Sequence, residues 1–243
     1  MALPKINSPK YEMVLPSTND RIQFRPYLVK EEKILMMAME SNDTNQMVRA
    51  IKEVISACTE GAVEVDQMTM FDLEYAFVQL RSKSVGESTT IGVKCESCEV
   101  KNDVEVDLSE VSVDIDPDSD KSSIIKLTDS IGVKMKYPSV DSVMEAQNSA
   151  PQNGTAVSEV QNVFNLLIRC IDSIYSDDEI FDASEQTHAE LLEFIESLNT
   201  EQFGRIREFI EGMPSASLNV DFKCVNCGTQ NNFDVQGIAN FFG

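Results

Sequence analysis

Two copies of a cysteine-containing hairpin pattern constrain the fold of this chain more than any other feature of its sequence. The first copy, VKCESCEVKNDVEV over residues 93–106, places Cys95 and Cys98 in a turn between two runs that alternate like β-strands. The second copy, VDFKCVNCGTQNNFDV over residues 220–235, places Cys224 and Cys227 in the same position. One C-x-x-C turn supplies only half of the ligands of a tetrahedral metal site. The sequence therefore predicts that two distant hairpins meet.

The two hairpins align at a constant offset of 129 residues, from 95 to 224 and from 98 to 227. The matched positions outside the cysteines are Lys94 with Lys223, Asn102 with Asn231, and Val106 with Val235. A weaker match joins residues 22–25 to 133–136. We infer a diverged tandem repeat of strand, helices and cysteine hairpin, with residues 1–112 and 113–243 as the two copies, which together are expected to form one compact unit. Chance similarity between short β-hairpins is the alternative.

The four cysteines predict a closed structural zinc site with Cys95, Cys98, Cys224 and Cys227 as ligands. The gap between the pairs is far longer than in a compact zinc ribbon, so the site must be assembled by tertiary folding. Three alternatives stay open: an iron–sulfur cluster, a redox pair and two turns without metal. A redox C-x-x-C normally begins a helix, whereas both pairs here lie between strands. Zinc is favoured because it explains two copies of one turn.

An enzyme is not expected. A catalytic zinc keeps an open position and usually has a histidine or carboxylate ligand, but the only histidine, His188, lies in a polar stretch that predicts a solvated helix residue. Neither a Gly-rich phosphate loop nor a Ser-His-Asp set is present, so we expect no small-molecule substrate. The Asp-rich segment 114–120 lacks the glycine and glutamate of a calcium loop, with Lys121 and Leu127 in their places.

The net charge of −21 limits the classes of partner. Such a chain is repelled by nucleic-acid phosphates and by anionic membranes, so we expect neither as a ligand and favour proteins with basic faces. Apolar runs stay far below the ~20 residues of a membrane helix, and the N-terminal residues do not resemble a signal peptide. These observations predict a reducing compartment, in which paired cysteines serve more often as metal ligands than as disulfides.

Hydrophobic periodicity predicts an α+β fold. The expected helices begin near residues 30, 47, 70, 140, 160, 184 and 200, and the one from 160 runs through Ile171. The expected strands cover residues 21–25 and 130–136 and the two hairpins, and residues 147–155 are expected to form a loop. Cys58 and Cys170 lie on apolar helix faces and are expected in the core.

Two sequence features have partner binding as one of their alternative explanations. Methionines cluster in residues 34–39 (ILMMAM), where core packing is the expected role and an adaptable binding surface is the alternative. The segment 81–87 (RSKSVGE) is unusually basic for this chain and follows a helix, so Arg81 and Lys83 are weak candidates for a docking patch. An ordinary polar helix end explains the segment equally well.

The N-terminal third resembles a known family. Residues 1–16 (MALPKINSPKYEMVLP), 24–35 (FRPYLVKEEKIL), 70–75 (MFDLEY) and 81–87 are similar to the baseplate hub subunit and hub-assembly proteins of T4-like contractile-tailed bacteriophages. The resemblance implies a role in virion assembly through contacts with other hub or tail proteins, in the tail baseplate or in the host cytoplasm during assembly. It carries over no catalytic residue and gives no metal assignment, so the zinc prediction depends on the cysteine spacing alone. An acidic zinc-ribbon module that inhibits a host protein or modulates transcription is the alternative function.

Overall fold

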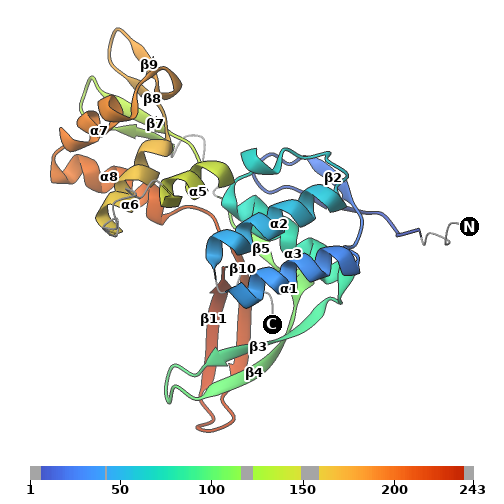
Figure 1. Cartoon of the computed structure of the whole chain (residues 1–243). Helices are drawn as coiled ribbons and strands as arrows, with labels where there is room; N and C mark the ends of the chain where they lie inside the picture. The colour runs from blue at the N-terminus through green and yellow to red at the C-terminus, as the bar shows by residue number, and fades with distance from the viewer. Residues whose placement is uncertain (1–6, 42, 116–122, 149–158, 238–243) are drawn as a thin grey trace, which may run out of the picture. The chain divides into compact units, whose positions relative to one another are not determined.

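The computed structural model describes residues 7–41, 43–115, 123–148 and 159–237, and its mixture of helices and small antiparallel sheets confirms the α+β class (Figure 1). Residues 116–120 of the Asp-rich segment and most of the loop predicted at 147–155 lie outside the described residues. The chain divides into two compact units, one formed by Met1–Asp114 with Ser215–Gly243 and the other by Ile115–Pro214.

The boundaries of these units differ from the predicted division between residues 112 and 113. After the second unit the chain returns to the first unit at Ser215, so both cysteine hairpins belong to the first unit. The return is fixed by strand pairing, because Ala216 lies opposite Val113 in a shared sheet. The hypothesis of two sequence repeats concerns the origin of the chain and stays a prediction.

In its described residues, the first unit contains a short hairpin, then three α-helices and two long hairpins. Its helices are α1 (Val29–Ser41), α2 (Thr44–Cys58), η1 (Val65–Gln67), α3 (Met70–Ser84) and η2 (Leu108–Glu110). Its strands are β1 (Tyr11–Val14), β2 (Arg21–Phe24), β3 (Ser88–Lys94), β4 (Lys101–Asp107), β5 (Ser112–Val113), β10 (Ala216–Lys223) and β11 (Gln230–Gln236).

Local sequence explains where the helices of this unit begin. Asp43 caps α2 by accepting a hydrogen bond from the Asn45 N–H at 2.9 Å, and the predicted apolar face of α2 is buried. Thr69 caps α3 by accepting from the Asp72 N–H. The reciprocal bond of a capping box is not formed here, because the Asp72 carboxylate instead accepts hydrogen bonds from the backbone and hydroxyl of Ser17. Asp72 thus joins the β1–β2 hairpin to α3.

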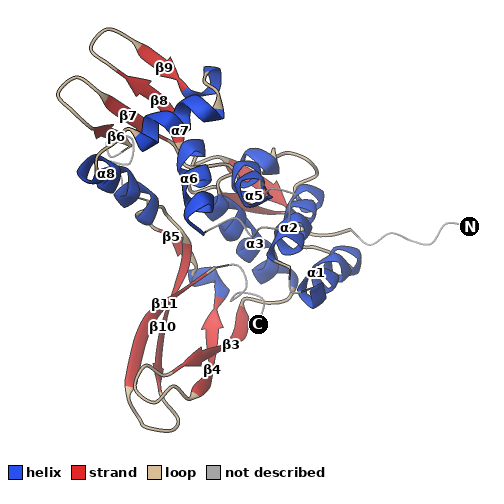
Figure 2. Ribbon diagram, turned by 60° about the vertical axis from the view of Figure 1, so that its left-hand side comes forward, coloured by secondary structure: helices blue, strands red, loops and turns tan. Residues whose placement is uncertain are grey.

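The two long hairpins lie side by side and extend away from the helices of their unit (Figures 1 and 2). Their inner faces share one apolar cluster with α3, in which Ile91 and Val93 meet Val220 and Phe222. The Phe222 and Phe233 rings pack edge to face with centroids 5.9 Å apart. Burial of alternate residues on both hairpins therefore brings the cysteine turns to the same place.

The second unit packs helices against a four-stranded antiparallel sheet of order β6-β7-β8-β9. Its strands are β6 (Ile124–Lys126), β7 (Gly132–Met135), β8 (Ile171–Tyr175) and β9 (Ile180–Asp182). Its helices are α5 (Val140–Asn148), α6 (Glu159–Arg169), η3 (Ala183–Glu185), α7 (His188–Glu196) and α8 (Thr200–Glu211). Of the helices that the structure describes in either unit, none has the length and apolarity needed to cross a bilayer.

Two of the predicted helix boundaries are wrong. The helix expected through Ile171 ends at Arg169, and Ile171 begins β8, which pairs with β7. Pairing with β7 outweighs the helical spacing of the apolar residues there, because residues 171–175 (IDSIY) also suit a strand. The helix expected from Ser184 begins at His188, where Thr187 and Glu190 form a capping box.

Candidate metal centre

The structure brings the four predicted cysteines together. All four sulfur atoms lie within 4.8 Å of one another, and we call Cys95, Cys98, Cys224 and Cys227 the cysteine cluster. The Cys95 and Cys227 sulfurs are 3.6 Å apart, and the Cys98 and Cys224 sulfurs are also 3.6 Å apart. Zinc–sulfur bonds of ~2.3 Å in a tetrahedron separate sulfurs by about 3.8 Å. The cluster therefore has the dimensions of a site for one tetrahedral ion.

Each pair is held by a turn with the same backbone contacts. In the first turn the Cys95 N–H donates to the Val100 carbonyl at 3.0 Å, and the Glu99 N–H donates to the Cys95 carbonyl at 2.9 Å. In the second turn Cys224 and Gly228 make the equivalent bonds at 2.9 and 3.0 Å. Glu99 and Gly228 both adopt positive φ, 57° and 71°. Glycine adopts this conformation freely, whereas glutamate at position 99 carries the steric cost.

Two buried asparagines connect the turns across the cluster. Asn102, on the first hairpin, accepts a hydrogen bond from the Val225 N–H of the second turn at 2.9 Å. Asn231, on the second hairpin, accepts from the Glu96 N–H of the first turn at 3.0 Å. Each side-chain amide also donates to a carbonyl of its own turn, at 2.8 and 2.9 Å. Each hairpin thus fixes the cysteine turn of the other.

Hydrogen bonds also favour thiolates in the second turn. The Cys227 N–H lowers the pKa of the Cys224 thiol to about 6, because it stabilises the charged sulfur. The Thr229 hydroxyl, 3.2 Å from the Cys227 sulfur, lowers the pKa of Cys227. The Val100 N–H acts to lower the pKa of Cys98, but desolvation and the hydrogen bonds shared with Cys227 and Cys224 raise it. Metal ions bind cysteine as the thiolate, so the lowered pKa values of Cys224 and Cys227 favour metal binding at the cluster.

The four cysteines of the cluster differ in their exposure to solvent. Cys95 and Cys224 are buried, Cys98 is partly buried and Cys227 is exposed. All four are free thiols, as are the two remaining cysteines of the chain. Burial raises the pKa of Cys58 to about 11 and that of Cys170 to about 12, so these two stay protonated in the core as predicted.

The other candidate residues lie away from the cluster. His188 is exposed at the start of α7, and its Nε2 lies 3.2 Å from the Asn165 Oδ1. Arg81 donates to the Thr89 hydroxyl at 3.2 Å, and Lys83 pairs with Glu87. A docking role for Arg81 and Lys83 stays a prediction.

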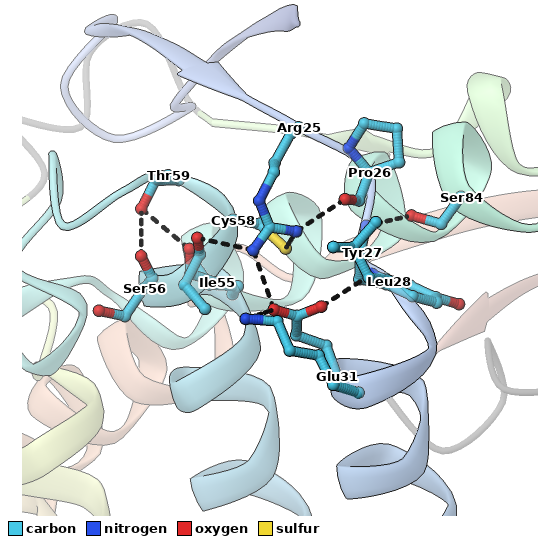
Figure 3. Close-up of polar contacts among 12 residues, drawn as sticks. Arg25, Pro26, Tyr27, Leu28, Glu31, Ile55, Ser56, Cys58, Thr59 and Ser84 are labelled. Carbon is cyan, nitrogen blue, oxygen red and sulfur yellow. Dashed lines mark hydrogen bonds and ion pairs between the residues drawn. The ribbon is translucent and has the colours of Figure 1, made fainter. Parts of the chain in front are cut away.

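A buried ion pair in the first unit was not predicted from the sequence. The Arg25 guanidinium donates to the Glu31 carboxylate at 2.9 Å and to the Ala57 carbonyl at 3.2 Å, and it lies 3.7 Å from the Cys58 sulfur (Figure 3). Glu31 also accepts from the Leu28 N–H at 2.8 Å. The pair therefore joins the start of α1 to the end of α2, and no sequence spacing marked it because its residues come from separate elements.

The comparisons with known proteins give the family. A family model described as T4 bacteriophage base plate protein matches residues 8–243. The chain belongs to this family. No curated protein and no solved structure matches it. The match confirms the resemblance to T4-like baseplate proteins, though not the hub subtype, and extends it over both units. Membership of this family supports a structural baseplate role and implies contacts with other phage tail proteins.

The two asparagines give this baseplate protein a testable feature beyond the cysteines. We expect Asn102→Ala and Asn231→Ala to destabilise the first unit by similar amounts, about 1–3 kcal/mol each, because each change removes two hydrogen bonds of a buried amide, one to each cysteine turn. Urea unfolding measures the loss, and Asn232→Ala, at an exposed position on the same strand, is the control. An effect at only one of the two buried asparagines would contradict the reciprocal arrangement.

Proposed function

We propose that this chain is a structural or assembly protein of the baseplate hub, acting through contacts with other hub or tail proteins. The observation that supports it most is the family match over residues 8–243, which includes both units and the cysteine hairpins. The N-terminal segments that resemble hub proteins favour the hub over other baseplate positions. The strongly negative charge of −21 favours partners with basic surfaces.

The role of the cysteine cluster in this proposal is structural. Four thiolates around one ion leave no open position for a substrate or a water, so zinc at this site would hold the two hairpins together and supply no reaction chemistry. Sulfurs within 4.8 Å of one another favour a single ion over an iron–sulfur cluster, in which the four thiolates are spread over two or more iron atoms. Two turns that contribute two ligands each make the metal a link between segments 129 residues apart.

Co-expression tests the hub proposal. We expect the chain to co-migrate in size-exclusion chromatography with at least one hub subunit of the same phage, and to lose the complex gradually as salt is raised, since charge contributes to binding. Co-expression with a baseplate subunit from outside the hub is the control. Failure to co-migrate with any hub subunit, together with binding to a subunit outside the hub, would contradict the hub assignment while leaving the family membership intact.

A further inference from the structure

Helix α1 carries an apolar stripe that faces away from its own unit. The exposed fractions are 80% for Val29, 57% for Met36 and 61% for Met37. Lys33 and Glu40 are also exposed. At 100° per residue these five positions fall within about 100° of one another on the helix surface. We call Val29, Lys33, Met36, Met37 and Glu40 the α1 stripe.

The opposite side of α1 is fixed to the unit. Glu31, Leu35 and Ala38 are buried against α2, and the Arg25–Glu31 pair holds the first turn of the helix (Figure 3). The backbone before α1 is also held, since the Tyr27 N–H donates to the Ser84 hydroxyl at 2.9 Å. The inner face therefore orients the helix, and the stripe is presented on a firmly placed element at the edge of the helical group (Figure 2).

The charges around the stripe differ from those of the chain as a whole. The exposed charged residues of α1 are Lys30, Lys33, Glu32 and Glu40, so their charges cancel in a chain of net charge −21. A neutral, apolar surface is where two acidic molecules could approach with the least repulsion. Large apolar side chains gathered in this way mark interaction sites more often than scattered ones do.

The order of residues along the stripe is self-complementary. Consider two antiparallel copies of α1 related by a twofold axis that passes between Met36 and Met37. A residue that precedes this axis in one copy then faces the residue that follows it by the same distance in the other copy. Lys33 and Glu40 each lie about 5 Å from that axis along the helix, on opposite sides. Lys33 of either copy therefore faces Glu40 of the other, and the methionines meet at the centre. An isologous interface requires this pairing.

We propose that the α1 stripe is a homodimer interface in which α1 of one copy packs antiparallel on α1 of a second copy. Two Lys33–Glu40 pairs flank a methionine centre, and Met side chains adapt to each other because they are unbranched and flexible. One helix pair buries less than the roughly 1,200–2,000 Å² of a stable complex, so the dimer is weak and forms at micromolar concentration. The proposal depends neither on the metal nor on the hub assignment.

A charge exchange tests the geometry, with sedimentation equilibrium of the full chain at physiological salt as the measurement. Lys33→Glu should raise the dimer Kd about tenfold, because it places a second carboxylate opposite Glu40 at two positions in each dimer. The double variant Lys33→Glu, Glu40→Lys should restore the original Kd to within about threefold. Weakening by the single change without rescue by the double one would overturn the twofold arrangement.

Substitution of the apolar centre provides a second test. Met36→Ser with Met37→Ser should raise the Kd by more than about tenfold, since apolar contact is lost in both copies. Met39→Ser is the matched control, because Met39 lies on the same helix about 100° from the centre of the stripe and should leave the Kd unchanged. A wild-type chain that stays monomeric at about 200 μM, well above the micromolar concentrations proposed for this weak dimer, would overturn the proposal. Loss of a complex with another baseplate protein on changing the stripe, without any self-association, would do the same.

Discussion

Replacing one ligand of the cysteine cluster should destabilise the first unit more than any other single change. In Cys95→Ser, the hairpins would lose a ligand of the zinc that we propose links them. Structural zinc contributes an apparent ~10–16 kcal/mol in small modules, comparable with the roughly 5–15 kcal/mol that stabilises a whole domain. Because the apolar cluster between the hairpins remains, we expect a loss of at least about 5 kcal/mol and a Tm lower by about 10–20 °C. Thermal unfolding of the variant beside the unmutated chain measures this.

A cysteine outside the cluster provides the control for this experiment. Cys170→Ala removes a buried thiol from the second unit, where the side chain has no exposed surface. It should cost about 1–2 kcal/mol of packing and retain the metal. Equal losses of stability in Cys95→Ser and Cys170→Ala would mean that the cluster contributes only as packed side chains.

The second large effect is expected at the buried ion pair. Glu31→Ala should cost about 3 kcal/mol, because it leaves the Arg25 charge and the Leu28 N–H without their main partner. This estimate is at the low end for buried pairs because the Arg25 side chain keeps an exposed fraction of 16%. Denaturant unfolding measures the loss, and Glu32→Ala, at the exposed neighbouring position, is the control. A change below about 0.5 kcal/mol would contradict the assigned role of the pair.

The same pair sets a pH dependence with a defined sign. Burial acts to raise the pKa of Glu31, but hydrogen bonds from Arg25 and the Leu28 backbone reverse this, and its pKa lies below the usual value. A carboxyl whose pKa is lower in the folded state stabilises the fold above its unfolded pKa of about 4.3. The contribution is lost as pH falls through the lower folded pKa. The free energy of unfolding of Glu31→Ala should therefore fall less than that of the unmutated chain as the pH is lowered below about 5.

The cysteine cluster could be predicted from the sequence because two short patterns specified it completely. Two C-x-x-C turns with alternating flanks indicated both the strands and the need for the turns to meet. The matched asparagines, Asn102 and Asn231, were visible in the same alignment, but their contacts were not. A side chain that bridges two hairpins can be assigned only when the relative position of the hairpins is known.

The rest of the fold required tertiary information. The run from Ile171 to Tyr175 suits either a helix or a strand, and pairing with β7 decides for the strand. The chain's return to the first unit at Ser215 depends on the pairing of β10 with β5 and with β11, which no local pattern encodes. Arg25 precedes α1 and Glu31 lies in its first turn, six residues later, so the three- or four-residue spacing of helical ion pairs could not predict their contact. The methionines at 36 and 37 were expected mainly in the core and are exposed.

The metal content of the purified chain tests the central claim most directly. Elemental analysis of protein purified without added chelator should find one zinc per chain, and Cys95→Ser purified in the same way should contain none. Thiol titration should then find the four cluster cysteines protected in the wild type and reactive after chelation. Iron in place of zinc would contradict the assignment of the ion. A stably folded chain without metal, whose stability is unchanged by zinc and by chelator, would contradict a structural metal site altogether.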